Sequence, residues 1–204
     1  MILDYKNERE FALANGVRLY STANYEIIYF CGKSESENET FAERFDAYNS
    51  HKNFKNITFR NFPNLELNNS TLENCTFENC ADILTDGCAI INSQFTDCCI
   101  ISSSYTDFYG CTFKDAKPAE ALLFLESNCK VDSCTFENIH AIGDEGQICK
   151  MLADKEKDVR ELTNCKFINC SLENKYNFFS SCQYNSFFVK GREVENLAES
   201  CVVI

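Results

Sequence analysis

The sequence contains few residues of several types, including proline and glycine, which interrupt regular structure. Among its 204 residues there is no tryptophan, and there are only two prolines, two methionines, two histidines and seven glycines. This scarcity of proline and glycine excludes a collagen-like chain and a disordered low-complexity chain. Zinc sites need closely spaced ligand pairs, and the chain has no Cys-x-x-Cys pair and only His51 and His140. We therefore predict no metal site and no cofactor.

Positive charge is scarce as well. The chain carries 31 acidic side chains against 19 lysines and arginines, which gives a formal net charge of −12. Nucleic acid repels such a surface, so direct binding of DNA or RNA is not expected. A basic protein is attracted to it, including an enzyme whose own nucleic-acid groove is basic. The charge thus predicts a protein partner with a basic surface.

Long apolar runs are absent too. The first ten residues lack a basic stretch followed by an apolar one, so no secretory signal is predicted. No apolar run reaches the about 18 residues that a membrane-spanning helix needs. We expect a cytoplasmic chain whose 14 cysteines are reduced thiols, because disulfides form mainly in secreted proteins.

The sequence does contain a repeated motif with an aromatic centre. It reads Asn-Cys-Thr-Phe-Glu-Asn-Cys at 74–80, and variants of it recur along the chain. The aromatic centres are Phe59, Phe77, Phe95, Phe113, Phe136, Phe167 and Tyr184. The first four lie 18 residues apart, and the later gaps are 23, 31 and 17 residues. Self-similarity at a fixed period is the signature of stacked coils, so we predict about seven coils.

Other positions of the repeat are either apolar or turn-forming. The positions five and two before the aromatic, and three and six after it, are apolar or small, and we predict that they face inward with it. The column six after the aromatic reads Leu65, Ile83, Ile101 and Ala119. The column two after it reads Asn61, Asn79, Asp97, Asp115, Asn138, Asn169 and Ser186. Asn and Asp favour tight turns, so each coil is predicted to run strand, turn, strand.

These spacings predict an all-β fold, a single-stranded right-handed parallel β-helix. A left-handed β-helix would show a hexapeptide period, whereas the apolar residues here recur at uneven offsets. A pentapeptide-repeat helix is a near alternative because Leu72 and Phe77 are five residues apart, but Asp82 and Gly87 break that period.

Over residues 54–188 the chain resembles right-handed parallel β-helix repeat proteins, the architecture of the pectate lyases. The stretch from Cys75-Thr-Phe-Glu-Asn-Cys80 through Gly87-Cys-Ala-Ile90 is also similar to the repeats of polymorphic surface proteins. The resemblance implies the fold alone and no activity.

The flanking segments are predicted to cap the coil stack, because an open end would expose strand edges. We expect 1–52 to form an N-terminal α/β capping region, 53–190 the β-helix and 191–204 a C-terminal tail. Within the cap, the expected elements are a short helix capped by Asp4 and ending at Asn15-Gly16, strands at 17–21 and 25–31, and an amphipathic helix at 39–49.

The repeat is stretched between Phe136 and Phe167, and near-helical spacing there predicts a projecting helix over 144–160. Insertions in repeat proteins often gather on the binding face, although a decorative loop is the alternative. The helix would carry a charged face. Its acidic residues Asp154, Glu156, Asp158 and Glu161 are the predicted contacts to a protein partner.

Asp97 and Asp115 are the candidates for catalysis. They are predicted to stack in one column, and coupled carboxylates can act as acid and base in enzymes that cleave polysaccharides. The simpler interpretation is that both are turn residues within an Asn ladder, which we favour because Asn and Asp commonly occupy turns.

The C-terminal Cys201-Val-Val-Ile204 matches a C-a-a-X prenylation box, which makes Cys201 a candidate lipidation site. Stable anchoring by one lipid needs a second membrane signal, and the preceding segment 192–200 is not polybasic. We favour the alternative of an apolar tail packed on the last coil. Membrane contact is expected only if Cys201 is prenylated.

The scaffold and its charge favour a non-enzymatic acidic β-helix protein that binds, and in one version inhibits, a protein partner. Occupation of the basic nucleic-acid groove of an enzyme is a concrete form of this hypothesis. Two other functions stay open at this point. One is a carbohydrate-active β-helix enzyme that uses Asp97 and Asp115, and the other is a bacterial effector prenylated at Cys201.

Overall fold

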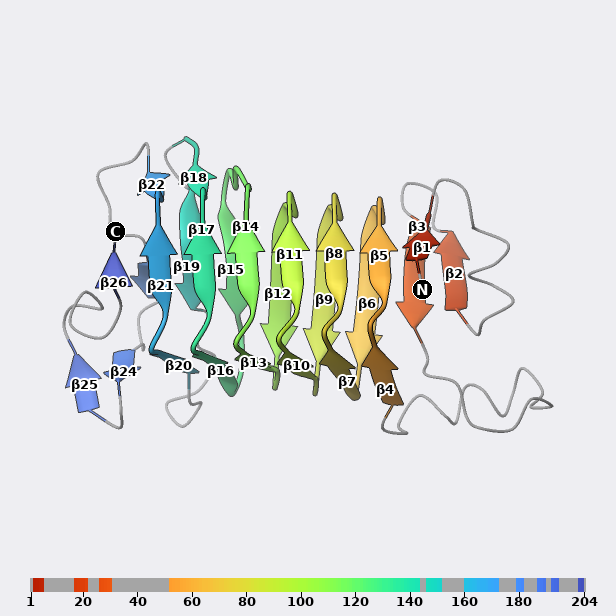
Figure 1. Ribbon diagram of the computed structural model, residues 1–204, viewed down its shortest axis with the longest axis horizontal. Helices are drawn as coiled ribbons and strands as arrows, with labels where there is room; N and C mark the ends of the chain where they lie inside the picture. The colour runs from red at the N-terminus through yellow and green to blue at the C-terminus, as the bar shows by residue number, and fades with distance from the viewer. Residues whose placement is uncertain are drawn as a thin grey trace.

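The repeated motif folds into strands that stack in three sheets. The computed structural model describes residues 2–5, 17–21, 26–30, 52–143, 146–151, 160–172, 179–181, 187–189, 192–194 and 202–203. Strands from successive coils pair in parallel, so each regular coil contributes one strand to each sheet. The coils stack into a rod, with the first coils at one end and the last at the other (Figure 1).

The three sheets are named in the order in which a coil visits them. Sheet A comprises β1 (Ile2–Asp4), β5 (Thr58–Arg60), β8 (Thr76–Glu78), β11 (Gln94–Thr96), β14 (Thr112–Lys114), β17 (Thr135–Glu137), β21 (Lys166–Ile168) and β26 (Val202–Val203). Sheet B comprises β2 (Val17–Ser21), β3 (Glu26–Phe30), β6 (Asn64–Asn68), β9 (Asp82–Asp86), β12 (Ile100–Ser104), β15 (Ala121–Leu125), β19 (Gln147–Met151) and β23 (Phe179–Ser181). Sheet C comprises β4 (Lys52–Lys55), β7 (Ser70–Glu73), β10 (Ala89–Ile91), β13 (Asp107–Tyr109), β16 (Cys129–Asp132), β20 (Arg160–Thr163), β24 (Phe187–Val189) and β25 (Arg192–Val194). A separate pair joins β18 (His140–Ala141) to β22 (Ser171–Leu172).

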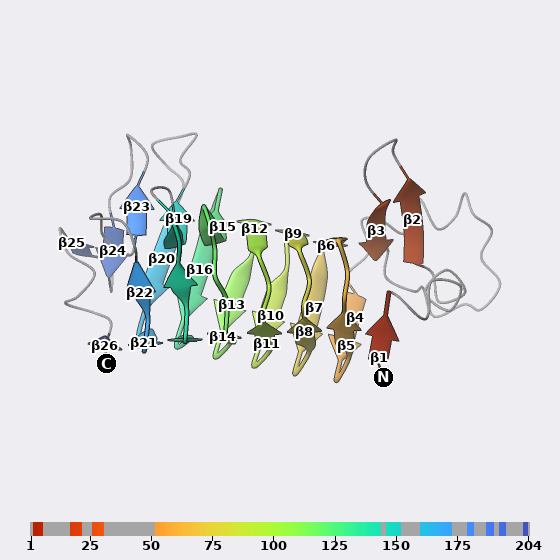
Figure 2. The ribbon, with the colours of Figure 1, turned by 90° about the horizontal axis from the view of Figure 1, so that it is seen from above.

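The coil is right-handed, as predicted. Figure 2, seen from above, places sheet A at the front of the rod and sheet B at the back. In Figure 1 the strands β5, β8 and β11 of sheet A point up and the strands β6, β9 and β12 of sheet B point down, while successive coils advance from right to left. A chain that rises at the front, descends at the back and advances to the left is right-handed, which is the hand that parallel crossovers almost always adopt.

The aromatic column forms the centre of the core. Its described members are Phe59, Phe77, Phe95, Phe113, Phe136 and Phe167, all at most 1% exposed. Neighbouring rings in this column lie 4.5–4.9 Å apart and nearly parallel. The column five before the aromatic is paired in register and buried from Leu72 to Leu162, which confirms the predicted inward face.

Each coil turns at three corners, and each corner has one residue with a left-handed backbone. The corner between sheets A and B uses Asn61, Asn79, Asp97, Asp115, Asn138 and Asn169. The corner between sheets B and C uses Asn69, Gly87, Tyr105 and Asn128. The corner between sheets C and A uses Asn56, Asn74, Asn92, Gly110, Ser133 and Asn164. Asn and Gly tolerate a positive φ, which explains the Asn-rich columns of the repeat.

One predicted inward position is wrong. Ala119 was expected beside Ile101, but Ala119 is exposed and Leu123 pairs with Ile101 instead. The chain makes an excursion after Ala116, so the strand in sheet B begins later than the 18-residue period requires. Tyr184 lies outside the described residues, and the place next to Phe167 in sheet A is taken by Val203 of β26.

The predicted helix over 144–160 is wrong where the structure describes it. Gln147–Met151 forms β19, which pairs in parallel with β15, and β20 begins at Arg160. The spacing of Ile148 and Met151 suggested a helix, but β15 offers an unpaired strand edge whose hydrogen bonds only another strand can satisfy. Residues 152–159 lie outside the described residues.

The N-terminal cap contains the two predicted strands. β2 and β3 form an antiparallel hairpin, and β3 pairs in parallel with β6, so the hairpin covers the first edge of sheet B. Asp4, the predicted cap of the first helix, is the last residue of β1, which pairs with β5. The rest of that helix and the helix expected at 39–49 lie outside the described residues. Within the described ranges no helix is long and apolar enough to cross a membrane.

Asp132 connects the two coils that flank the longest insertion. Thr163 Oγ1 donates a hydrogen bond of 2.6 Å and Asn164 Nδ2 one of 2.9 Å to Asp132 Oδ1, and Ser133 Oγ donates one of 3.2 Å to Oδ2. These hydrogen bonds hold the pKa of Asp132 below its usual value, and the one from Thr163 has the largest effect. We expect Asp132→Ala to lower the free energy of unfolding by about 2 kcal/mol, because hydrogen bonds to charged groups contribute about 1.5–3 kcal/mol.

Urea denaturation of the wild type and of Asp132→Ala would measure this loss. A carboxyl with a lowered folded pKa stabilises the fold above its unfolded pKa and loses that contribution as the pH falls. The difference between the two proteins should therefore shrink below about pH 4. Asp107→Ala, on the neighbouring strand β13, is the control and should cost less than about 0.5 kcal/mol. Equal losses in both variants would contradict the role of Asp132.

Candidate partner-binding groove

The outer face of sheet B carries a row of side chains that crosses the strands. Alternate residues of a strand face the same side, and parallel strands in register place equivalent residues next to one another. Glu66, Leu84 and Ser102 form such a row because they pair in register across β6, β9 and β12. Successive members of the row are separated by the strand spacing of about 4.8 Å.

A second row follows the ends of the same strands, at the corner toward sheet C. Asn68, Asp86 and Ser104 pair in register, and Glu126 continues the row just after β15. Ser104 Oγ donates a hydrogen bond of 2.7 Å to Glu126 Oε2. Asn68 Nδ2 donates one of 2.9 Å to Glu66 Oε1, which connects this row to the first.

The two rows line a groove of about 310 Å³. This volume is at the lower end of the range for ligand-binding pockets, about 300–1,000 Å³. The lining includes the carboxylates of Glu66, Asp86 and Glu126, and among the residues that the structure describes it includes no lysine or arginine. Leu84 and Tyr105 also line the groove and are 42% and 57% exposed. Carboxylates and exposed apolar groups together suit a basic ligand that also has an apolar part.

Tyr105 stands at the edge of this groove in an unusual conformation. Its φ is 48°, in the left-handed region, whereas Asn69, Gly87 and Asn128 occupy the equivalent corner positions. A bulky residue is rarely found there, because its Cβ is crowded by the backbone. Such strained residues occur frequently at functional sites.

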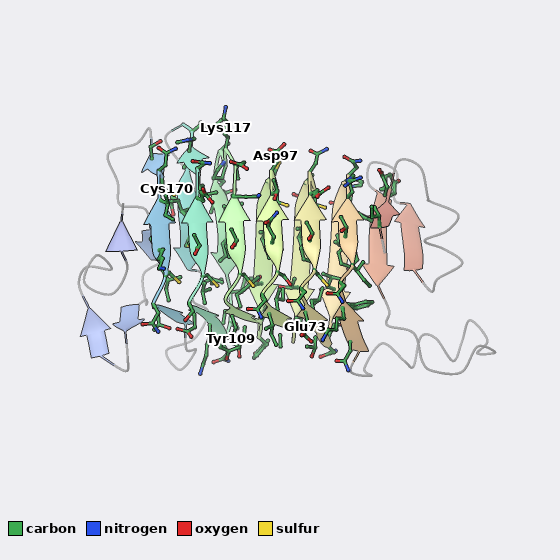
Figure 3. All side chains as sticks on the ribbon, viewed as in Figure 1. Glu73, Asp97, Tyr109, Lys117 and Cys170 are labelled. Carbon is green, nitrogen blue, oxygen red and sulfur yellow. The ribbon has the colours of Figure 1, made fainter. Side chains whose placement is uncertain are left out.

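Asp97 and Asp115 lie at the corner between sheets A and B, away from the groove. Both are exposed, and Figure 3 shows Asp97 at the upper edge of the rod. Asn138 Nδ2 donates a hydrogen bond of 3.0 Å to Asp115 Oδ1, and Asn79 Nδ2 donates one of 2.7 Å to Asn61 Oδ1. These contacts form a side-chain ladder of the kind that the turn interpretation predicts. Acid–base catalysis by the pair remains an untested prediction.

Most of the other predicted site residues fall outside the described part of the chain. Asp154, Glu156 and Asp158 lie outside it, as does Cys201. The backbone of Glu161 belongs to β20, in register with Lys130. Val202–Val203 forms β26 and pairs with β21, which agrees with a C-terminal tail packed on the last coil. Binding by the four acidic residues and lipidation of Cys201 remain predictions.

The cysteines of the described coils are packing residues. All eleven are free thiols, nine of them are buried, and Cys99 is exposed. Burial raises the pKa of the Cys88 thiol to about 11, and it raises the pKa of the enclosed Cys149 well above the usual value. Within the described residues no group of three or more potential ligands could hold a metal ion. Buried thiols of this kind act as small apolar side chains.

A contact that the sequence did not indicate joins His140 and Ser171. His140 Nδ1 lies 2.8 Å from Ser171 Oγ, across the register pair of β18 and β22. Serine and histidine can serve as nucleophile and base, but such catalysis also requires an acid that orients the histidine and donors that stabilise an oxyanion. Among the described residues the His140 ring has no second side-chain partner, and the contact joins two paired strands.

The repeat pattern of the sequence does not indicate the groove. Its carboxylates come from three different coils, at positions where the repeat shows no distinctive column. Tyr105 provided the one available signal, because it occupies a column in which the other described members are Asn and Gly. A tyrosine in a glycine or asparagine column indicates a position where function outweighs local backbone preference.

Comparisons with known proteins do not assign a function. No protein-family model matches the chain, and no curated protein matches it. Among solved structures it is similar to full-length QnrB1, a plasmid-mediated fluoroquinolone resistance protein, with 13% identity and a TM-score of 0.19, over 66% of this chain and 93% of that one. So low a TM-score carries no argument, and the β-helix assignment depends on the strand pairing of this chain itself.

Proposed function

We propose that this chain is a non-enzymatic acidic β-helix protein that binds a protein partner through a basic surface of that partner. The groove on sheet B carries this proposal, because it combines three carboxylates with exposed Leu84 and Tyr105. The net charge of −12 would attract a basic partner from a distance. The stacked strands hold the groove rigidly, so little ordering is required on binding.

Inhibition of an enzyme by occupation of its basic nucleic-acid groove is the form of this function that the charge favours. An acidic rod repels nucleic acid itself and is attracted to the surfaces that bind it. The acidic segment with Asp154, Glu156, Asp158 and Glu161 would then add to the attraction.

The proposal predicts a salt-dependent interaction that depends on the groove. Immobilised wild type should retain basic proteins at low ionic strength and lose most of them when salt is raised from about 0.05 to about 0.5 M, because screening weakens exposed charge pairs. The variant Glu66→Gln, Asp86→Asn, Glu126→Gln should retain much less.

A control variant separates the groove from net charge. This variant combines Asp97→Asn, Asp107→Asn and Glu137→Gln, so it also removes three negative charges but from other faces of the rod. It should retain nearly as much partner as wild type. Retention that is indifferent to salt, or that falls equally in both variants, would contradict the proposal.

A further inference from the structure

We infer that the groove binds an extended segment of the partner that carries two arginines four residues apart. This inference rests on the proposed function and specifies the chemistry of the partner. It is carried by the spacing of the carboxylates, by the aromatic wall at Tyr105, and by a cation site that the chain already forms on the same face.

The spacing comes from the strand ladder. Glu66 on β6 and Glu126 after β15 lie at the two ends of the groove, and β9 and β12 lie between them. Three strand spacings across the sheet and an offset of two residues along the strands place the two Cα positions about 16 Å apart. Four residue steps of an extended peptide cover about 13 Å, and the long arginine and glutamate side chains span the remainder. Residues i, i+2 and i+4 of an extended segment share one face, so the two end residues would meet the glutamates. The middle residue would lie over Leu84.

The same face of sheet B already seats a basic side chain of the chain itself. Lys150 Nζ lies 5.5 Å from the centroid of the Phe124 ring and 3.0 Å from Glu120 Oε1. Phe124 follows Ser102 in the first row, because the two residues pair in register. An aromatic ring beside a carboxylate therefore holds a cation immediately next to the groove. Tyr105 and Glu126, which both line the groove, are the same two kinds of side chain.

Arginine fits this combination better than lysine. A guanidinium group is planar, so it can stack on an aromatic ring while its N–H groups donate to a carboxylate in two parallel hydrogen bonds. Tyr105 remains exposed in a strained backbone conformation, and it would supply the stacking surface. The partner segment is therefore expected to read Arg-x-Φ-x-Arg, in which Φ is an apolar residue.

Peptide titration by calorimetry would test this inference on the full chain. The probe acetyl-Arg-Ser-Val-Ser-Arg-amide should bind about fivefold more tightly than its isomer acetyl-Ser-Arg-Val-Arg-Ser-amide, because only the first reaches both glutamates. The lysine version of the first peptide should also bind more weakly. The groove variant Glu66→Gln, Asp86→Asn, Glu126→Gln should lose the preference, and the control variant Asp97→Asn, Asp107→Asn, Glu137→Gln should keep it.

Tyr105→Asn provides a second readout that a purely structural role would not produce. Asn is the usual residue of this corner, so the variant should melt about 2–4 °C higher than wild type. Its affinity for the first peptide should nevertheless fall about fivefold, whereas Tyr105→Phe should keep that affinity.

Several outcomes would overturn the inference. The first is equal affinity for the two peptide isomers, or a preference between them that survives in the groove variant. The second is a lysine peptide that binds as tightly as the arginine peptide. The others are unchanged peptide affinity in Tyr105→Asn and displacement of the peptide by equimolar spermine. If a basic protein is still retained through the groove in a salt-dependent manner, the proposed function stands while the arginine segment is excluded. If retention of basic proteins is also lost, both fail.

Discussion

Replacing Phe95 by alanine is expected to lower the free energy of unfolding by about 3–5 kcal/mol. Phe95 is 1% exposed, and its ring lies 4.5 Å from that of Phe77 and 4.9 Å from that of Phe113. The substitution removes the stacking surface on both sides at once. The cavity would be difficult to refill, because the stacked coils hold the rings above and below at a fixed spacing.

Gln94→Ala is the matched control for this loss. Gln94 precedes Phe95 on β11 and faces outward, so its truncation should cost no more than about 0.5 kcal/mol. Urea denaturation of wild type and both variants would give the two values. A Phe95 variant no less stable than the Gln94 variant would mean that the inner and outer faces of sheet A are assigned wrongly.

The second large effect is expected at alkaline pH, where the fold should lose stability because buried thiols cannot ionise. Burial raises the pKa of Cys88 from 9.0 to about 11, and it raises that of Cys149 well above its usual value. The unfolded chain releases these protons near pH 9 and the folded chain does not, so the stabilisation is complete below about pH 8 and declines as the pH rises. Cys88 alone should account for a loss of about 1.4 kcal/mol between pH 8 and 10, and Cys149 should add to the loss in the same direction.

Cys88→Ala isolates the contribution of one thiol. The variant should lose about 1.4 kcal/mol less than wild type between pH 8 and 10, whatever its stability at neutral pH. Thr106→Val is the control, because Thr106 is the buried residue in register with Cys88 on the next coil and does not ionise in this range. If Cys88→Ala and Thr106→Val show the same pH dependence, the Cys88 thiol already ionises in the folded state.

The placement of the groove suggests why the strain at Tyr105 is tolerated. The stacked coils on both sides fix the corner, so one unfavourable backbone conformation does not disturb the neighbouring corners at Gly87 and Asn128. Gly87 itself has little room for change, since an added Cβ would lie 2.6 Å from Asn69 Oδ1. The corner between sheets B and C thus combines structural positions with one position, Tyr105, that lines the groove.

Insertions mark the places where prediction from the sequence failed. The repeat gave correct inward positions wherever coils follow at 18 residues, as from Phe59 to Phe113. After Ala116 the chain leaves that period, so Ala119 was assigned to the interior in place of Leu123. The apolar spacing at 147–151 resembles that of a helix, but the segment forms a strand that pairs with the open edge of β15. Hydrogen bonding between strands outweighs the local spacing there.

The sequence by itself determined the coil. Every turn of a β-helix meets the same environment above and below, so the stacked aromatic rings and the left-handed corners both recur as columns that can be read in one dimension. Only the tertiary structure decided the groove. Glu66, Asp86 and Glu126 are distant in the chain and occupy no distinctive column, and they become one acidic surface because parallel pairing stacks successive coils about 4.8 Å apart.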